Sequence, residues 1–248
     1  MRKIFGILFC VLILGEGLKA QSKYGADSVN CVMNLSLYRE YYKQQNYDDA
    51  IKPWRWVYNN CPSANGNIFK NGPKLIKYLM KKNPENKQAY IDTLMMIYDK
   101  RIQYFGKQGY VLGKKGADLI KYSPSSYEKA YSILGNSLEM QGNSSEAGAL
   151  LAYFKSATLM EKNGKIDKQV ILECYARVAE ITDYNMVNNT KKEKYYSQSS
   201  EIIESLFAPY ANCDDLIGIF STKFNSETED VDLLKRIIRL LDSKECND

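Results

Sequence analysis

The chain has 248 residues, of which 45% are hydrophobic and 25% are charged, a composition that is typical of globular proteins and excludes a disordered or fibrous chain. It contains no histidine. Serine-histidine-aspartate hydrolysis, cysteine-histidine proteolysis and histidine-ligated metal sites are therefore excluded, because each needs an imidazole nitrogen. The net charge of +5 is a weak excess that indicates no particular partner.

The first residues have the pattern of a secretory signal peptide. A basic start at Arg2 and Lys3 precedes an apolar stretch over 4–14, and the small residue Ala20 is followed by a polar one. An uncleaved membrane anchor is the alternative, but eleven residues are fewer than the roughly 20 that cross a bilayer. We expect cleavage after Ala20 and a periplasmic or secreted product without a membrane span.

Removal of residues 1–20 leaves a small positive charge on the mature chain. Export makes nucleic acid an implausible partner, so the lysine pairs at 81–82, 114–115 and 191–192 are interpreted as solvated helix surfaces. Residues 21–30 are expected to form a flexible mature N-terminus.

From Asn30 onward apolar residues recur every three to four positions. The pattern is interrupted at Pro62, Pro84, Pro124, Gly142, Gly164 and Pro209, where we expect breaks between helices. Short connections between the segments predict successive antiparallel hairpins in an all-α domain over 31–248. The eleven predicted helices cover 31–44, 47–60, 66–82, 86–105, 111–122, 127–141, 144–162, 167–184, 190–208, 214–223 and 228–243.

Two local features qualify this pattern. Pro53 lies inside a predicted helix, so we expect a kink or a later start there. Gly106, Gly109, Gly113 and Gly116 follow no strand and belong to no phosphate-binding loop, so they predict a tight loop and close helix packing.

Residues 31–64 match the spacing of a 34-residue helical repeat. Counted from Cys31, Tyr41 is at position 11, Ala50 at 20, Trp54 at 24 and Pro62 at 32. A small residue at position 20 permits close helix approach, and the proline ends the second helix. The unit resembles the tetratricopeptide repeat (TPR), although polar or bulky residues occupy positions 4 and 8.

A second unit, 128–161, resembles the same repeat. Leu134 is at position 7, Gly135 at 8, Ala147 at 20 and Leu151 at 24. Residues 65–124 do not fall into this register, which leaves the repeat boundaries there open. The two units together predict a TPR-like right-handed superhelix.

Three further segments, 90–106, 109–116 and 206–213, are similar to exported TPR proteins of the Bacteroidota kind. The similarity covers essentially the whole mature chain. It implies a periplasmic or secreted helical-repeat protein without assigned chemistry.

The TPR resemblance also implies which residues line a concave binding face. In the first unit these are Val32, Leu35, Arg39, Tyr42 and Lys43, an aromatic and basic set suited to an extended segment that carries a carboxylate. In the second unit they are Lys129, Ser132, Asn136, Glu139 and Met140. An ordinary solvated surface is the alternative interpretation of both sets.

Five cysteines remain after the leader. Cys31 begins the first helix of a hairpin and Cys61 ends the second, so both lie at the same end of an antiparallel pair and can form a disulfide. Cys213 and Cys246 bracket the last hairpin in the same way. Cys174 lies on an apolar helical stripe, so we predict a buried free thiol.

Tyrosine is the most unusual component, with 20 residues against 8 phenylalanines. A tyrosine ring packs well while its hydroxyl stays wet, which suits both inter-helix packing and a peptide-binding groove. Packing alone is the simpler interpretation.

These observations predict a non-catalytic exported protein that binds a protein or peptide in the cell envelope and uses no cofactor and no metal. A glycan- or small-ligand-binding helical protein is the first alternative. A glycosidase that uses only carboxylates is the second, because such an enzyme needs two acids across a groove and no histidine. Ser28 and Thr93 lie in short sequences that resemble an O-glycosylation signal of exported Bacteroidota proteins.

Overall fold

The computed structural model describes residues 23–226, 231–242 and 244–246. These residues form eleven α-helices and no strand, which confirms the predicted all-α class. None of the described helices is long and apolar enough to cross a bilayer. The predicted signal peptide lies outside the described residues. The helices are α1 Ser28–Lys43, α2 Tyr47–Asn60, α3 Asn67–Lys82, α4 Lys87–Phe105, α5 Gln108–Tyr122, α6 Tyr127–Gln141, α7 Ala147–Lys162, α8 Lys168–Asn188, α9 Glu193–Phe207, α10 Cys213–Ser226 and α11 Val231–Asp242.

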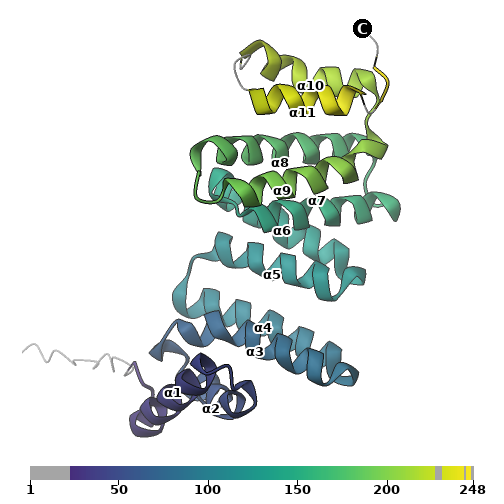
Figure 1. The fold of residues 1–248 in the computed structure, drawn as a ribbon. Coiled ribbons are helices and arrows are strands. Elements are labelled where there is room, and N and C mark those ends of the chain that lie inside the picture. Colours follow the sequence, from purple (N-terminus) through teal and green to yellow (C-terminus); the bar gives the residue numbers. More distant parts are fainter. Residues whose placement is uncertain (1–22, 227–230, 243, 247–248) are drawn as a thin grey trace, which may run out of the picture.

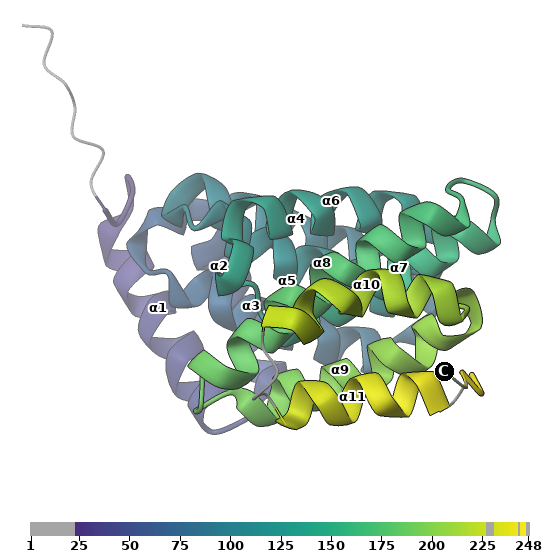
Figure 2. The same ribbon diagram turned by 90° about the horizontal axis from the view of Figure 1, so that it is seen from above.

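The helices are stacked in chain order, with α1 and α2 at one end and α10 and α11 at the other (Figure 1). Each helix from α1 to α8 contacts the next along the chain, α7 also contacts α5 and α9, and α10 contacts α11. Seen along the stack, α10 lies over the middle of the molecule, whereas α11 runs along one edge and α1 lies at another (Figure 2). Helices α2 to α8 are therefore each packed between their neighbours in sequence.

Short 3-10 turns occupy many of the connections between helices. Those at Pro62–Ala64, Pro84–Asn86 and Pro124–Ser126 begin with proline, and Ala208–Tyr210 contains Pro209. A proline fits the first turn because that position needs no backbone donor. The breaks predicted at Pro62, Pro84, Pro124 and Pro209 are thus confirmed.

Several helix limits differ from the predicted ones. Helix α1 begins at Ser28 because the Asp27 carboxylate accepts a hydrogen bond from the Asn30 backbone N–H at 3.1 Å. Residues 28–30 are therefore helical, and not part of a flexible N-terminus. Helix α7 begins at Ala147 because Gly142–Ser144 form a 3-10 turn instead of its first turn.

Pro53 does not delay the start of its helix. Helix α2 runs from Tyr47 through Pro53, and the ring is buried. Pro73 is likewise buried inside α3. Each proline forgoes one backbone hydrogen bond but adds apolar surface to the core. The expectation of a later start was wrong because helix packing outweighs that loss.

The core is one continuous cluster that extends through the stack. Trp54 is 1% exposed and donates from Nε1 to the carbonyl of Ile68 at 2.8 Å, which joins α2 to α3. Many tyrosines pack in or against this core, and Tyr175 stacks on Phe207 with a ring separation of 3.7 Å. The tyrosine excess therefore serves packing at several helix contacts.

The closest helix contact depends on three glycines of α5. A Cβ atom at Gly109 would lie 2.8 Å from the Met140 side chain, and one at Gly113 would lie 2.9 Å from the Ser137 hydroxyl. A Cβ at Gly116 would overlap Leu134. The predicted role of these glycines in close packing is confirmed, whereas Gly106, with a φ of +63°, forms the tight loop before α5.

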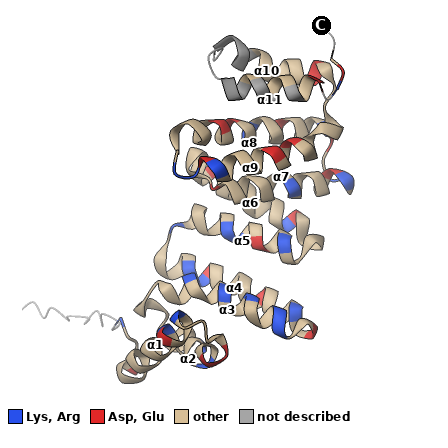
Figure 3. Ribbon diagram, viewed as in Figure 1, with Lys and Arg blue, Asp and Glu red and all other residues tan. Residues whose placement is uncertain are grey.

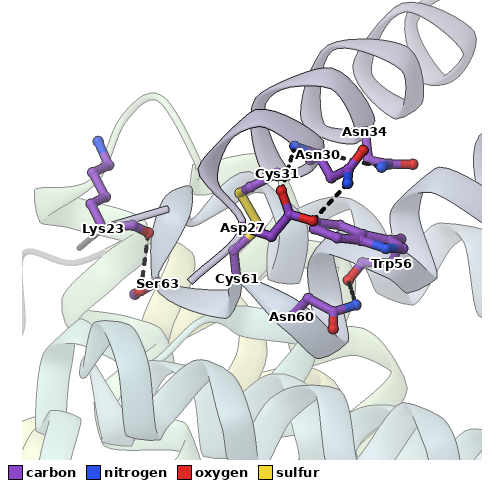
Figure 4. Close-up of a disulfide and its surroundings, with 9 residues drawn as sticks. All are labelled: Lys23, Asp27, Asn30, Cys31, Asn34, Trp56, Asn60, Cys61 and Ser63. Atoms are coloured by element: carbon purple, nitrogen blue, oxygen red, sulfur yellow. Dashed lines mark hydrogen bonds between the residues drawn. A yellow bond between two sulfur atoms is a disulfide. The ribbon is translucent and has the colours of Figure 1, made fainter. Parts of the chain in front are cut away.

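Both predicted disulfides are present. Cys31–Cys61 joins the start of α1 to the end of α2 with a Cα separation of 6.2 Å, and Cys213–Cys246 joins the last hairpin with a separation of 5.6 Å. Figure 4 shows the first disulfide between Asp27, which caps α1, and Ser63, whose hydroxyl donates to the Lys23 carbonyl. Among the described residues, Cys174 is the free cysteine, and it is buried as predicted.

The α5–α6 contact can be tested by adding a single methyl group. We expect Gly116→Ala to lower the free energy of unfolding by about 1–3 kcal/mol, because the new Cβ overlaps Leu134. Gly148→Ala on α7 is the control, since no atom lies within 4 Å of its Cβ position. That variant should be neutral or more stable by about 0.5–1 kcal/mol. Urea unfolding measures both, and equal effects would contradict the packing argument.

Thiol titration tests the cysteine arrangement. The mature chain, unfolded without reductant, should contain one reactive thiol, from Cys174, and five after reduction. Replacing Cys31 and Cys61 together with serine should cost about 3–4 kcal/mol, because the disulfide restricts the unfolded chain. Three thiols before reduction would show that one disulfide does not form, and five would show that neither forms.

Candidate functional site

An open groove of about 430 Å³ lies beside α1, and two of the predicted binding residues line it. Its lining comes from α1 and, through Asn71, from α3. We call it the α1 groove and define it by Ser36, Arg39, Glu40, Lys43 and Asn71. Its volume is within the range of ligand pockets, and its surface is polar.

The charge in the α1 groove is positive. Arg39 and Lys43 are one helical turn apart and both are exposed, and neither forms an ion pair with a carboxylate of the described residues. Glu40 lies between them but accepts a hydrogen bond from the Gln44 side chain at 2.8 Å. Two cations therefore remain available to an external anion.

Tyr42 is less available than predicted. Its ring is half-buried and lies 5.6 Å from the ring of Tyr47, which in turn lies 5.4 Å from Tyr78. The Lys74 ammonium lies 5.8 Å from the Tyr42 ring centre and 5.2 Å from that of Tyr47. Burial raises the pKa of the Tyr42 hydroxyl. The hydrogen bond between Lys74 and Tyr47 raises the pKa of Lys74. Tyr42 thus packs against α2 and α3 and is not among the residues that line the α1 groove.

Leu35 was predicted to line the binding face, and this is wrong. Leu35 is buried in the core with Cys31 and Tyr38, which lie on the same side of α1. Burial also raises the pKa of Tyr38 to about 12, so its hydroxyl stays neutral at physiological pH. These three residues hold α1 on the stack and are inaccessible to a partner.

The opposite side of α1 exposes large apolar side chains. Val29 is 77% exposed, and three other residues of this side are 41–50% exposed. We call them the α1 apolar stripe, which consists of Val29, Val32, Met33 and Leu37. The spacing of three to four residues places them on one face of the helix. Sequence reasoning included Val32 but missed the other three, although the same spacing was visible in the sequence.

The predicted residues of the second repeat lie elsewhere. Asn136 and Glu139 are exposed on α6. Helices α3 to α5 lie between α6 and the α1–α2 pair in the stack (Figure 1). The structure therefore does not join these residues with Arg39 and Lys43 in one site, and neither of them lines the α1 groove.

Within the described parts of the chain, no group of three or more cysteine, aspartate or glutamate side chains could hold a metal ion. Glu40 is the single carboxylate among the residues that line the α1 groove, so no second acid faces it there.

Of the two predicted O-glycosylation positions, Ser28 is exposed and Thr93 is half-buried. Ser28 is the first residue of α1, and the hydroxyl of Thr93 donates to the Ala89 carbonyl of α4 at 2.8 Å. Their modification stays a prediction.

The chain matches no protein-family model, and no curated protein shows significant sequence similarity to it.

Asp48 gives this region a pH dependence that can be measured. Its carboxylate accepts from Lys82 at 2.7 Å and from the Tyr78 hydroxyl at 2.9 Å, and these bonds lower its pKa below 3.8. A lowered pKa in the folded state stabilises the fold above the ordinary pKa, and this contribution is lost as the pH falls through the lowered value. Asp48→Asn should therefore lower the urea midpoint of unfolding at pH 7. The difference in midpoint between the variant and the native chain should become smaller below pH 3.8.

Asp49→Asn is the matched control, because Asp49 is also in the first turn of α2 but forms no ion pair with the described residues. Its midpoint should change less at pH 7. A difference between Asp48→Asn and the native chain that stays constant with pH would assign the loss to packing, not to charge.

Proposed function

We propose that the chain is an exported TPR-like helical-repeat protein that binds a protein partner through α1. Three features support the class. Helical pairs follow one another in a stack, residues 31–64 and 128–161 have TPR-like spacing, and two disulfides suit an oxidising compartment outside the cytoplasm. In this proposal the stack is a right-handed superhelix and residues 1–20 are the export signal.

The α1 apolar stripe is the observation that carries the binding function. Four exposed apolar side chains on one face of a helix are typical of an interaction surface. The α1 groove follows the stripe along the same helix and adds Arg39 and Lys43. This combination fits a segment of a partner protein that offers apolar side chains and a nearby carboxylate.

The disulfide explains how α1 can bear this surface. Cys31, Leu35 and Tyr38 attach one side of α1 to the core, and the covalent bond to Cys61 fixes the helix without using its outer side. A helix that is held in this way does not need to order when the partner binds, which reduces the entropic cost of association.

Site-specific photo-crosslinking tests the proposal. A photoreactive amino acid in place of Met33 should give a discrete adduct with a protein of the cell envelope. The same group in place of Tyr195 on α9 is the control, since that side chain is 63% exposed and lies far along the stack. The Tyr195 position should give no such adduct.

Charge variants then test the role of the groove. Arg39→Gln combined with Lys43→Gln should weaken the Met33 adduct strongly, because both cations lie next to the stripe. Tyr42 is left intact, since its loss would disturb packing with Tyr47. The same adducts from both crosslinking positions, or none from Met33, would contradict the proposed surface.

A further inference from the structure

A second open groove lies where α3, α4, α5 and α6 come together, and it shares no residue with the α1 groove. Its volume is about 610 Å³. Figure 3 shows basic residues along α3, α4 and α5 in this part of the stack. We call it the basic groove, and its lining consists of Lys70, Arg101, Lys107, Gln108, Gly109, Tyr110, Met140, Gln141 and Ser144.

Three cations enter the basic groove from different segments. Lys70 belongs to α3, Arg101 to α4, and Lys107 to the connection before α5. No aspartate or glutamate is among the lining residues. A concave surface that gathers positive charge in this way attracts anions more strongly than an open one.

Other lysines on these helices, outside the basic groove, do form ion pairs with carboxylates. On the same helices, Lys77 pairs with Asp118, Lys114 with Glu146, and Lys115 with Asp99. None of Lys70, Arg101 and Lys107 forms an ion pair with a carboxylate of the described residues. The packed lysines of this region are thus neutralised within the fold, whereas those in the groove are not.

One of the three cations is also positioned by its surroundings. The Arg101 guanidinium lies 5.3 Å from the centre of the Tyr110 ring, and Lys114 lies 5.5 Å from the same ring. Contact with an aromatic ring holds a guanidinium in place while its N–H donors stay free. Arg101 is therefore arranged to bind a carboxylate or sulfate with little further ordering.

The rest of the lining is neutral and polar. Gln108, Gln141 and Ser144 contribute amide and hydroxyl groups, and Met140 is the one large aliphatic side chain of the set. Tyr110 already has two cations near its ring. A groove for a peptide would offer more apolar contact area, as the α1 apolar stripe does. Anions and many hydroxyls in one extended ligand are the chemistry of an acidic oligosaccharide.

We propose that the basic groove binds an anionic oligosaccharide, with carboxylate or sulfate groups on Lys70, Arg101 and Lys107 and sugar hydroxyls toward Gln141 and Ser144. This site is independent of the proposed protein partner, because a different set of residues and helices forms it. Charged sugars would bind at the middle of the stack while a protein is bound at its end.

Calorimetric titration of the full mature chain tests this site with three probes of similar length. An oligogalacturonate offers carboxylates, a heparin-derived oligosaccharide offers sulfates, and a malto-oligosaccharide is uncharged. At about 150 mM salt, where charges further apart than about 8 Å are screened, we expect binding of at least one acidic probe and no binding of the neutral one. The acidic probe that binds more tightly identifies the anionic group.

Two triple variants with the same loss of charge separate a site from general attraction. Lys70→Gln/Arg101→Gln/Lys107→Gln should reduce the affinity at least about tenfold. Lys52→Gln/Lys155→Gln/Lys194→Gln changes exposed lysines outside the groove and should leave the affinity within about twofold. Thermal unfolding confirms that both variants fold.

Three results would overturn the proposal. They are equal losses in the two variants, binding of neither acidic sugar, and binding of a polyglutamate peptide as tight as that of the sugars. None of them bears on the protein partner, because the Met33 crosslink reports on α1 alone. Loss of that crosslink would likewise not contradict the proposed oligosaccharide site.

Discussion

The stacking of each helix on its neighbours in sequence is the constraint on which the structure depends, and it is tightest between α5 and α6. Three glycines of α5 leave room there for Leu134, Ser137 and Met140 of α6. The Ser137 hydroxyl donates to the Gly109 carbonyl at 2.7 Å inside this contact. Contacts in a stack are local, so loss of the α5–α6 contact would remove the main connection between the helices before α6 and those after α5. Three residues with no side chain are thus required for the α5–α6 contact.

Local signals in the sequence were sufficient for most of the fold. Prolines and apolar spacing located the helices, and the position of each cysteine in its hairpin predicted both disulfides. The predicted starts of α1 and α7 were wrong because a local hydrogen bond or turn, and not the apolar spacing, sets where each helix begins. Asp27 extended α1 by one turn through a side-chain bond, and Gly142 began a 3-10 turn in place of α7. Such competition depends on geometry that periodicity does not contain.

The sites were harder to predict than the helices. Leu35 and Arg39 are one turn apart and share a face by spacing, yet Leu35 is buried and Arg39 is exposed. The boundary between them is set by where α2 and α3 lie, and a single helix cannot show it. The basic groove was even harder to predict, because residues 70, 101, 107 and 141 come together only through the packing of four helices. Each of them alone resembles an ordinary surface residue.

Helix α1 lies at the end of the stack, so no further described helix covers its outer side. The same apolar residues on an internal helix would be buried by the next helices. An internal helix has its apolar face covered by the next pair, whereas α1 has contacts on one side and the α1 apolar stripe on the other. A terminal helix that needed only solubility would bear polar groups on that side. Val29, Val32, Met33 and Leu37 expose apolar area to water instead, and burial of that area by a partner is favourable at about 25 cal/mol per Å². The disulfide to Cys61 keeps this surface in place, so the proposed recognition at α1 depends on the position of this helix at the end of the described stack.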